Sequence, residues 1–436
     1  MSGVVTTPAV WTAEKMVALP EPKRHLHSPS PVAPGFVAPI APPHLSFTPI
    51  ALAGAIARTA TTQESAPIEL LERRTGNALS DLEYLISDGP TFALSPNFEY
   101  LIDIERTHFA GQVGSGITHL VMESLGYNWR ANADCLTATQ EPHGDLLYGN
   151  GSVSRHGVVL TEAHGSFSAR ASAGHVRKEC DDKYLRQVRP WVGEDSPHGK
   201  VIHGYSVAFG CKPKTAGASV ALSETRINKP RRTADRPPAA EPGGEAPLAP
   251  TSMALTTHRS NFLLMGARPV AKWIDWLHGV GGAPADPGPV EFLVLEYAGR
   301  QFMASITPLV PVASLRWWFD EIYGHPFMWR HHPRHTDGSV VRQGSGWFVI
   351  ERTAGERFLH ELSGMIRGGR ERQPARLDLP TFNPEGFGFG GEFAAIHPRR
   401  GEYEYAMFSD GLALLGTPKR DPIVRSVLWW PKDGVQ

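Results

Sequence analysis

The clearest pattern of hydrophobic and polar positions predicts two neighbouring strands over residues 145–167. Leu146 to Tyr148 form a short apolar run, and the Gly-Asn-Gly-Ser sequence at 149–152 is typical of a tight turn. The next apolar run, at 158–160, is Val-Val-Leu without alternation, which is typical of a strand buried on both faces. The pattern therefore predicts a hairpin whose second strand lies inside a sheet.

Helical patterns flank this hairpin. Apolar residues recur every three or four positions over 113–125 and end at Gly126, which is a favoured helix terminator. Residues 174–190 are highly charged but keep a narrow apolar edge, and 201–210 form an apolar run of strand length. The predicted order is helix, strand, strand, helix, strand.

Two carboxylates adjoin the apolar runs of the hairpin. Asp145 directly precedes the first run, and Glu162 follows the second after a single threonine. An unpaired carboxylate beside a buried strand is costly, because it loses its hydration. A divalent cation is one partner that compensates, and Mg²⁺ prefers such oxygen ligands.

The residues Pro142…Asp145, followed after an apolar strand by Glu162-Ala163-His164, resemble the core motif of the PD-(D/E)XK nuclease superfamily. The resemblance implies an α/β fold with a restriction-endonuclease-like α-β-β-α-β core. It also implies that Asp145 and Glu162 bind Mg²⁺ or Mn²⁺. His164 would stand where the family has a lysine that orients water and stabilises the phosphate.

The helix after the motif contains a candidate for the missing lysine. Lys183 and Gln187 are four residues apart and share a helix face, and relatives can present a migrated lysine or a glutamine from this helix. The alternative interpretation is an ordinary solvated charged face. Together with His164, these two residues complete the predicted catalytic set.

The helix before the motif lacks the third acid that relatives often carry. Counting back three turns from Gly126 reaches Ser115 rather than an acid. Glu123 or Glu105 would be a substitute, but neither has the usual position. An ordinary amphipathic helix explains the same pattern.

Composition narrows the environment of the protein. The chain has 436 residues, a formal net charge of −1 and a sequence pI of about 7.0, so any surface for nucleic acid must be local. Its three cysteines are far apart, which favours free thiols in a reducing, cytoplasmic location. The sequence has no signal-peptide pattern and no apolar run of the roughly 20 residues that a membrane helix needs.

The distribution of proline and glycine predicts four regions. We expect a Pro-rich, disordered arm at 1–62, a nuclease-like domain at 63–228, a Pro/Gly-rich linker at 229–252, and an α+β domain at 253–436. In the last region the pattern predicts a helix through residue 278, a helix at 315–323, a strand at 347–350, a helix face at 358–366, and hairpins turning at 298–300 and 409–411.

A basic, aromatic segment in the last region is a weaker candidate for nucleic-acid binding. It follows Trp329 and includes Arg330, His331, His332 and Arg334. A polar surface loop is the alternative. The glycine-rich segment 386–391 lacks the lysine of a phosphate-binding loop, so we interpret it as a plain loop.

Three functional hypotheses remain open. The first is a metal-dependent nuclease acting on DNA or RNA through Asp145 and Glu162. The second is a catalytically inactive protein that keeps the nuclease fold for binding or assembly, with a protein partner held by 253–436. In the third, the two carboxylates only cap turns, and the chain is an assembly factor unrelated to nucleases. The sequence leaves the oligomeric state open.

Overall fold

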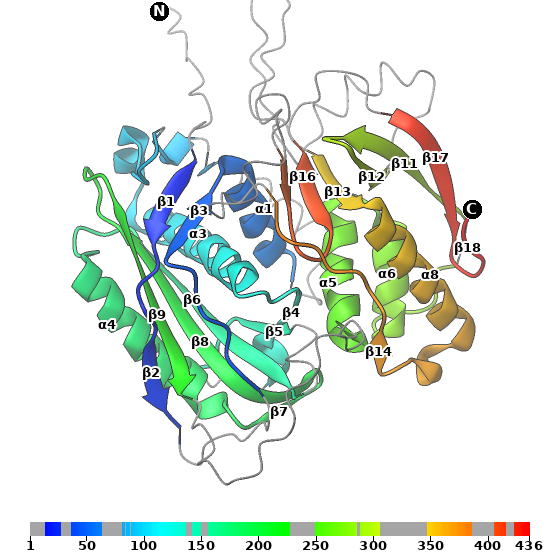
Figure 1. Ribbon diagram of the computed structural model, residues 1–436, viewed down its shortest axis with the longest axis horizontal. Coiled ribbons are helices and arrows are strands. Elements are labelled where there is room, and N and C mark those ends of the chain that lie inside the picture. Colours follow the sequence, from blue (N-terminus) through cyan, green and yellow to red (C-terminus); the bar gives the residue numbers. More distant parts are fainter. Residues whose placement is uncertain are drawn as a thin grey trace, which may run out of the picture.

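The computed structural model describes residues 14–27, 36–62, 81–82, 84–87, 89–136, 142–149, 156–226, 249–285, 288–305, 347–385, 405–415 and 423–436. Over these residues the chain is a mixed α/β protein with two large sheets side by side (Figure 1). The first sheet holds the predicted motif, and the second is built mainly from the C-terminal third of the chain.

The first sheet has the strand order β2-β9-β8-β6-β5-β4, with β7 paired to β8. Strands β4, β5 and β6 are antiparallel neighbours, whereas β6 and β8 are parallel. The strands are β2 (Lys23–Leu26), β4 (Trp129–Asn132), β5 (Leu146–Gly149), β6 (Val158–Ser166), β7 (Asp195–Ser196), β8 (Gly199–Cys211) and β9 (Ala218–Arg226).

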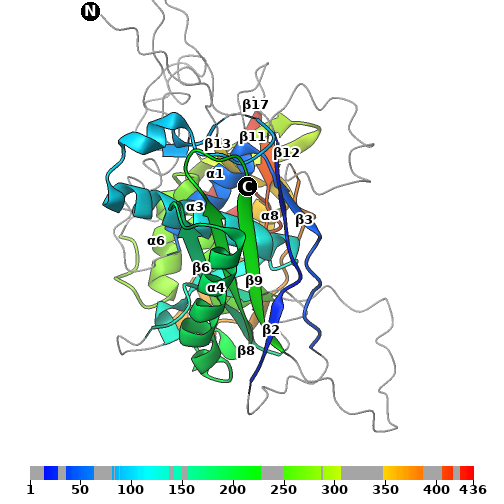
Figure 2. The same ribbon diagram turned by 90° about the vertical axis from the view of Figure 1, so that its left-hand side faces the viewer.

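Helices cover both faces of this sheet. Helix α3 (Asp103–Ser124) approaches β6 so closely that a Cβ on Gly165 would lie 1.7 Å from the Ala110 oxygen. Helix α4 (Ala173–Lys183) packs on the opposite face, in front of β8 and β9 in Figure 2, and connects the parallel strands β6 and β8. Two parallel strands in one sheet need a crossover connection, which is usually a helix.

The predicted order of helix, strand, strand, helix, strand is present as α3, β5, β6, α4 and β8. Two details differ from the prediction. The short strand β4 lies between α3 and β5, and α3 begins ten residues before the apolar pattern at 113, in a polar first turn. That turn is closed by the Glu105 side chain, which accepts a hydrogen bond from the Ile102 backbone at 3.0 Å.

The second sheet is antiparallel, with the order β15-β16-β13-β12-β11-β17-β18. Its strands are β11 (Val290–Tyr297), β12 (Arg300–Ser305), β13 (Trp347–Glu351), β15 (Tyr405–Met407), β16 (Leu412–Leu415), β17 (Ile423–Trp430) and β18 (Gly434–Val435). Both hairpins expected in this region form. The turn Ala298-Gly299 has φ values of 50° and 76°, as a two-residue hairpin turn requires.

Three longer helices accompany the second sheet. They are α5 (Thr251–Leu264), α6 (Arg268–Leu277) and α8 (Arg352–Gly368), and α5 also packs against β4 of the first sheet. In Figure 1, α5 stands between the first sheet and α6. The remaining short elements are η1 (Pro96–Tyr100), η2 (Ala133–Leu136), η4 (Tyr184–Val188), η5 (Arg189–Trp191), η6 (Arg370–Arg372), and the pair β10 (Ala249–Pro250) and β14 (Arg376–Leu377).

The structure corrects the expectation of a disordered arm at 1–62 for the residues of this arm that it describes. Residues 14–27 and 36–62 contain β1 (Lys15–Ala18), β2, β3 (His44–Phe47) and α1 (Pro49–Ala60). Their apolar side chains, such as Leu52 and Ile56, are buried in the main core. Proline did not exclude order here, because Pro49 occupies the first turn of a helix, where its missing N–H costs nothing.

The predicted helix through residue 278 is also corrected. The chain forms two helices, α5 and α6, that are separated at Gly266, whose φ of 76° cannot continue a right-handed helix. Helix α5 begins at Thr251, inside the segment expected to be the linker. Four sets of predicted residues lie outside the described part of the chain: residues 229–248 of that linker, the helix expected at 315–323, the candidates Arg330, His331, His332 and Arg334, and the loop 386–391.

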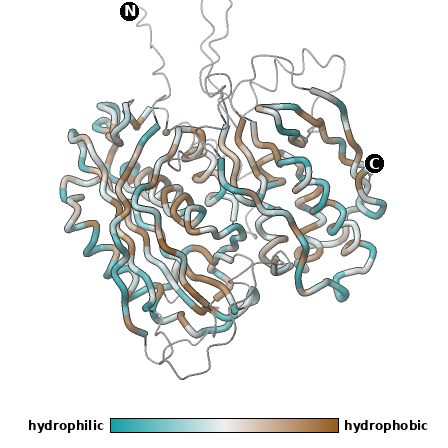
Figure 3. Tube along the Cα trace, in the orientation of Figure 1, coloured by the Kyte–Doolittle hydropathy of each residue, from teal (hydrophilic) through white to brown (hydrophobic). Residues whose placement is uncertain are grey.

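The structure has two units, one built around the first sheet and one around the second. One large hydrophobic core runs through both units. It includes Val113 of α3, Val159 of β6, Phe262 of α5 and Phe358 of α8. Apolar stretches line the inner sides of the elements in Figure 3, and hydrophilic stretches lie on outer helices such as α4. Within the described part of the chain, no helix combines the length and the apolar character needed to cross a bilayer.

Candidate active site

Asp145 is fixed at the start of β5 by hydrogen bonds to the neighbouring strand. Its backbone N–H donates to the Thr161 oxygen at 2.9 Å, and its Oδ2 accepts from the Ala163 backbone at 2.8 Å. The side chain is exposed on one side. The carboxylate is therefore held in one orientation against β6 while it still faces solvent.

Glu162 lies on β6 and is only 2% exposed. Its Oε1 accepts a hydrogen bond from Lys183 Nζ at 2.9 Å, whereas its Oε2 is buried and has no hydrogen-bond partner among the described residues. Burial raises the pKa of Glu162 to about 8, and the negative charge of Asp145 raises it further, against the opposing effect of Lys183. A proton shared with the neighbouring Asp145 satisfies such an oxygen, and so does a bound cation.

Lys183 comes from the last turn of α4, directly before an unusual helical segment. Residues Tyr184–Val188 form a π-helix, a local geometry that is found frequently at functional sites. The Tyr184 hydroxyl bonds Thr225 at 2.7 Å and anchors this segment to β9. Within the segment, Gln187 Oε1 is buried and has no partner among the described residues.

His164 turns towards α4 in a different cluster. Its Nε2 lies 3.1 Å from Glu179 Oε2, and the other oxygen of Glu179 lies 3.2 Å from His175 Nε2. The basic side chain that contacts Glu162 is therefore Lys183 rather than His164. The predicted residues Asp145, Glu162 and Lys183 come together from three different elements.

The two substitute acids on α3 are engaged elsewhere. Glu105 closes the first turn of its own helix, as described above. Glu123 accepts hydrogen bonds from the Ser409 backbone at 3.1 Å and from the Ser409 hydroxyl at 2.6 Å. Ser115, at the position where an acid was sought, offers no carboxylate. The pair Asp145–Glu162 thus has no third acid from α3.

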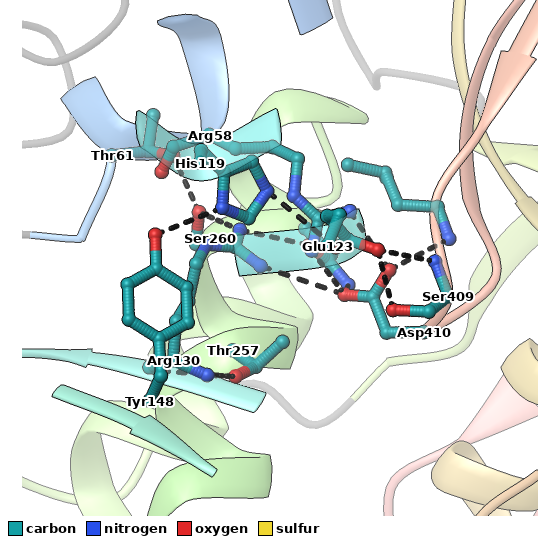
Figure 4. Close-up of polar contacts among 12 residues, drawn as sticks. Arg58, Thr61, His119, Glu123, Arg130, Tyr148, Thr257, Ser260, Ser409 and Asp410 are labelled. Carbon is teal, nitrogen blue, oxygen red and sulfur yellow. Dashed lines mark hydrogen bonds and ion pairs between the residues drawn. The ribbon is translucent and has the colours of Figure 1, made fainter. Parts of the chain in front are cut away.

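A second polar cluster, which the sequence did not predict, lies between the two units (Figure 4). Arg58 of α1 donates two hydrogen bonds of 2.8 Å to the carboxylate of Asp410, and Asn261 of α5 donates a third of 2.8 Å. All three side chains are buried. Arg58 and Asp410 are 352 residues apart in the chain, so no local motif signals the pair.

The rest of this cluster balances its charges. Arg130 lies 3.5 Å from Asp410 and donates to Ser260 at 3.0 Å, and burial lowers the pKa of Arg130 to about 9. Burial raises the pKa of Glu123 to about 7, and His119 bonds the Tyr148 hydroxyl at 3.0 Å. Because these side chains are enclosed in protein, we interpret the cluster as a structural connection between the units.

The carboxylate pair alone offers few ligands to a metal ion. Within the described ranges, no group of three or more His, Cys, Asp or Glu side chains has the arrangement of a metal site. A cation at Asp145 and Glu162 would therefore take its other ligands from backbone, water or substrate, as Mg²⁺ commonly does. Comparison of the chain with protein-family models, with curated proteins and with solved structures found no match.

Proposed function

We propose that this protein is a metal-dependent nuclease with a restriction-endonuclease-like core, and that it hydrolyses phosphodiester bonds at Asp145, Glu162 and Lys183. The observation that carries the proposal is the 2.9 Å contact of Lys183 Nζ with Glu162, whose other carboxylate oxygen is buried and accepts no hydrogen bond from the described residues. Two carboxylates and a lysine in one place supply the acidic ligands and the positive group that the PD-(D/E)XK motif requires.

Each side chain has a distinct role in this proposal. Asp145 and Glu162 would hold Mg²⁺ or Mn²⁺, and Glu162 would have to lose its proton to do so. The bound cation would supply a water of lowered pKa and neutralise charge on the phosphate. Lys183, which stays one-third exposed beside Glu162, would donate hydrogen bonds to phosphate oxygens as their charge develops.

The surface near Lys183 suits a polyanionic substrate in spite of the neutral net charge. Arg177, Arg186 and Arg189 are exposed on α4 and the helical turns that follow it. Phosphate contacts from such side chains supply most of the sequence-independent affinity for nucleic acids. The position of these arginines favours nucleic acid over a small phosphodiester.

The test is cleavage of labelled DNA and RNA in Mg²⁺ or Mn²⁺ by the full chain and by near-isosteric variants. Asp145→Asn, Glu162→Gln and Lys183→Met should each lower the rate by about 100-fold or more. The matched control is Lys178→Met, because Lys178 lies on the same helix but pairs with Asp182 at 2.8 Å on the exposed side. Equal losses in Lys178→Met and Lys183→Met would contradict the proposed role of Lys183.

A second candidate function is a binding or assembly protein that keeps this fold without catalysis. The observation that favours it is the engagement of Glu105 and Glu123 elsewhere, which leaves the site with two acids. Calorimetric titration with Mn²⁺ separates the two candidates. A nuclease binds the metal and loses binding in Asp145→Asn, whereas a scaffold binds no metal and cuts neither nucleic acid.

A further inference from the structure

A row of side chains extends from Lys183 along the helical segment towards Asp145. Lys183, Gln187 and Trp191 are spaced by four residues through the end of α4, the π-helix and η5. The row begins at Glu162, which Lys183 contacts, and ends at Pro142, three residues before Asp145. One end of the row therefore contacts a carboxylate of the candidate active site, and the other end contacts the segment of chain that leads to Asp145.

Trp191 is held in a fixed position at the end of this row. Its Nε1–H donates to the Pro142 oxygen at 2.9 Å, and its ring meets the His143 ring edge to face at 6.2 Å and 87°. His143 is itself placed by Asp134, at 3.6 Å. Trp191 is only partly buried, so part of this fixed side chain stays accessible near the segment that leads to Asp145.

Gln187, in the middle of the row, provides a second and independent observation. Its Oε1 is buried but has no hydrogen-bond partner within the described part of the chain. A buried amide oxygen without a donor costs free energy unless something supplies one. An aromatic side chain and an acceptor without a donor among the described residues thus lie in one row that starts at Glu162.

We propose that Trp191 stacks on the base next to the phosphodiester bond that is cut, so that the preferred substrate is single-stranded nucleic acid. The proposal rests on the proposed function, because it places the cut at Asp145 and Glu162. In a duplex each base is covered by its neighbours, and its face becomes available only when the strand is single or the base is unstacked.

The first experiment compares cleavage of a labelled single strand with that of its duplex, by the full chain in Mn²⁺. Wild type should prefer the single strand, and Trp191→Ala should lower cleavage of the single strand by about 10- to 100-fold, the range that one base–aromatic stack supports. Trp191→Phe should retain most of the preference. The matched control is Trp276→Ala, since Trp276 is another partly buried tryptophan, on α6.

The second experiment removes the base instead of the tryptophan. Once the cut position is mapped, single abasic sites are placed one at a time on either side of it. At one flanking position the abasic site should slow wild type as much as Trp191→Ala does, and should leave Trp191→Ala unaffected. Abasic sites that slow both proteins equally at every position would overturn the proposal.

Binding separates this proposal from the proposed function. Fluorescence anisotropy of the same oligonucleotides without metal reports stacking whether or not the bond is cut. Tighter binding of the single strand that is lost in Trp191→Ala, with no cleavage in any metal, would refute the nuclease and retain the stacking role. Equal affinity of wild type for single strand and duplex would overturn the stacking role itself.

Discussion

Replacing Glu162 by glutamine should stabilise the protein, and more so as the pH rises. The buried carboxyl has its pKa raised to about 8, mainly by burial, so the folded protein holds a proton there that the unfolded chain releases above pH 4.5. Stability therefore falls as the pH rises from 4.5 to 8, because the folded state binds more protons than the unfolded state. Glutamine has nearly the same shape and cannot ionise.

The magnitude follows from the size of the shift. A pKa raised from 4.5 to about 8 corresponds to about 5 kcal/mol of unfavourable ionisation, at about 1.4 kcal/mol for each pH unit. The free energy of unfolding of Glu162→Gln should thus match that of wild type near pH 4.5. It should exceed the wild-type value by about 3–5 kcal/mol above pH 8.

The assay is urea unfolding in EDTA at several pH values between 5 and 9, followed by tryptophan fluorescence and circular dichroism. The control is Glu179→Gln, which removes a carboxylate from the partly exposed neighbouring cluster on α4. A difference between wild type and Glu162→Gln that stays constant with pH would refute the reasoning. So would a Glu162→Gln protein that is less stable than wild type at pH 9.

Three further predictions concern the metal, the buried cluster and the helix contact. The apparent affinity for Mn²⁺, measured by calorimetry, should rise between pH 6 and 8 because binding must release the proton of Glu162; a flat profile would contradict this. Asp410→Ala should destabilise the chain by about 3–5 kcal/mol in urea, since the buried guanidinium of Arg58 loses both hydrogen bonds and keeps, among the described carboxylates, only Glu123, at 3.7 Å. A loss below about 1 kcal/mol would count against the pairing of Arg58 with Asp410. Gly165→Ala should abolish soluble expression, because the new Cβ would lie 1.7 Å from the Ala110 oxygen. Its control is Gly111→Ala on the open side of α3, which should stabilise the helix by about 0.5–1 kcal/mol.

Sequence reasoning succeeded where the determinants are local. The turns at 298–300 and 409–411 are determined by residues that are neighbours in the sequence, and both predicted hairpins are confirmed. Asp145 and Glu162 stand out because acidic residues adjoin buried strands, and Lys183 because the family that the motif resembles can present a lysine from the following helix. The roles of these residues stay predictions, but their proximity is a fact of the fold.

Sequence reasoning failed where the determinants are distant or depend on context. The pair Arg58–Asp410 joins positions 352 residues apart, and neither residue lies in a pattern that marks it as buried. The N-terminal segment was interpreted as disordered from its prolines, although its strands and helix gain stability from surfaces formed much later in the chain. Proline content reports local backbone preference, whereas order there is decided by tertiary burial.

The position of β2 has a consequence for how the protein assembles during synthesis. This strand pairs in parallel with β9, about 200 residues later in the chain, and Arg24 bonds Glu224 across that pairing. His25 also stacks on Tyr184, the residue that follows Lys183. A ribosome must therefore release β9 before β2 can dock on it. The contact that His25 makes beside the lysine proposed for catalysis would thus form only once β9 is available.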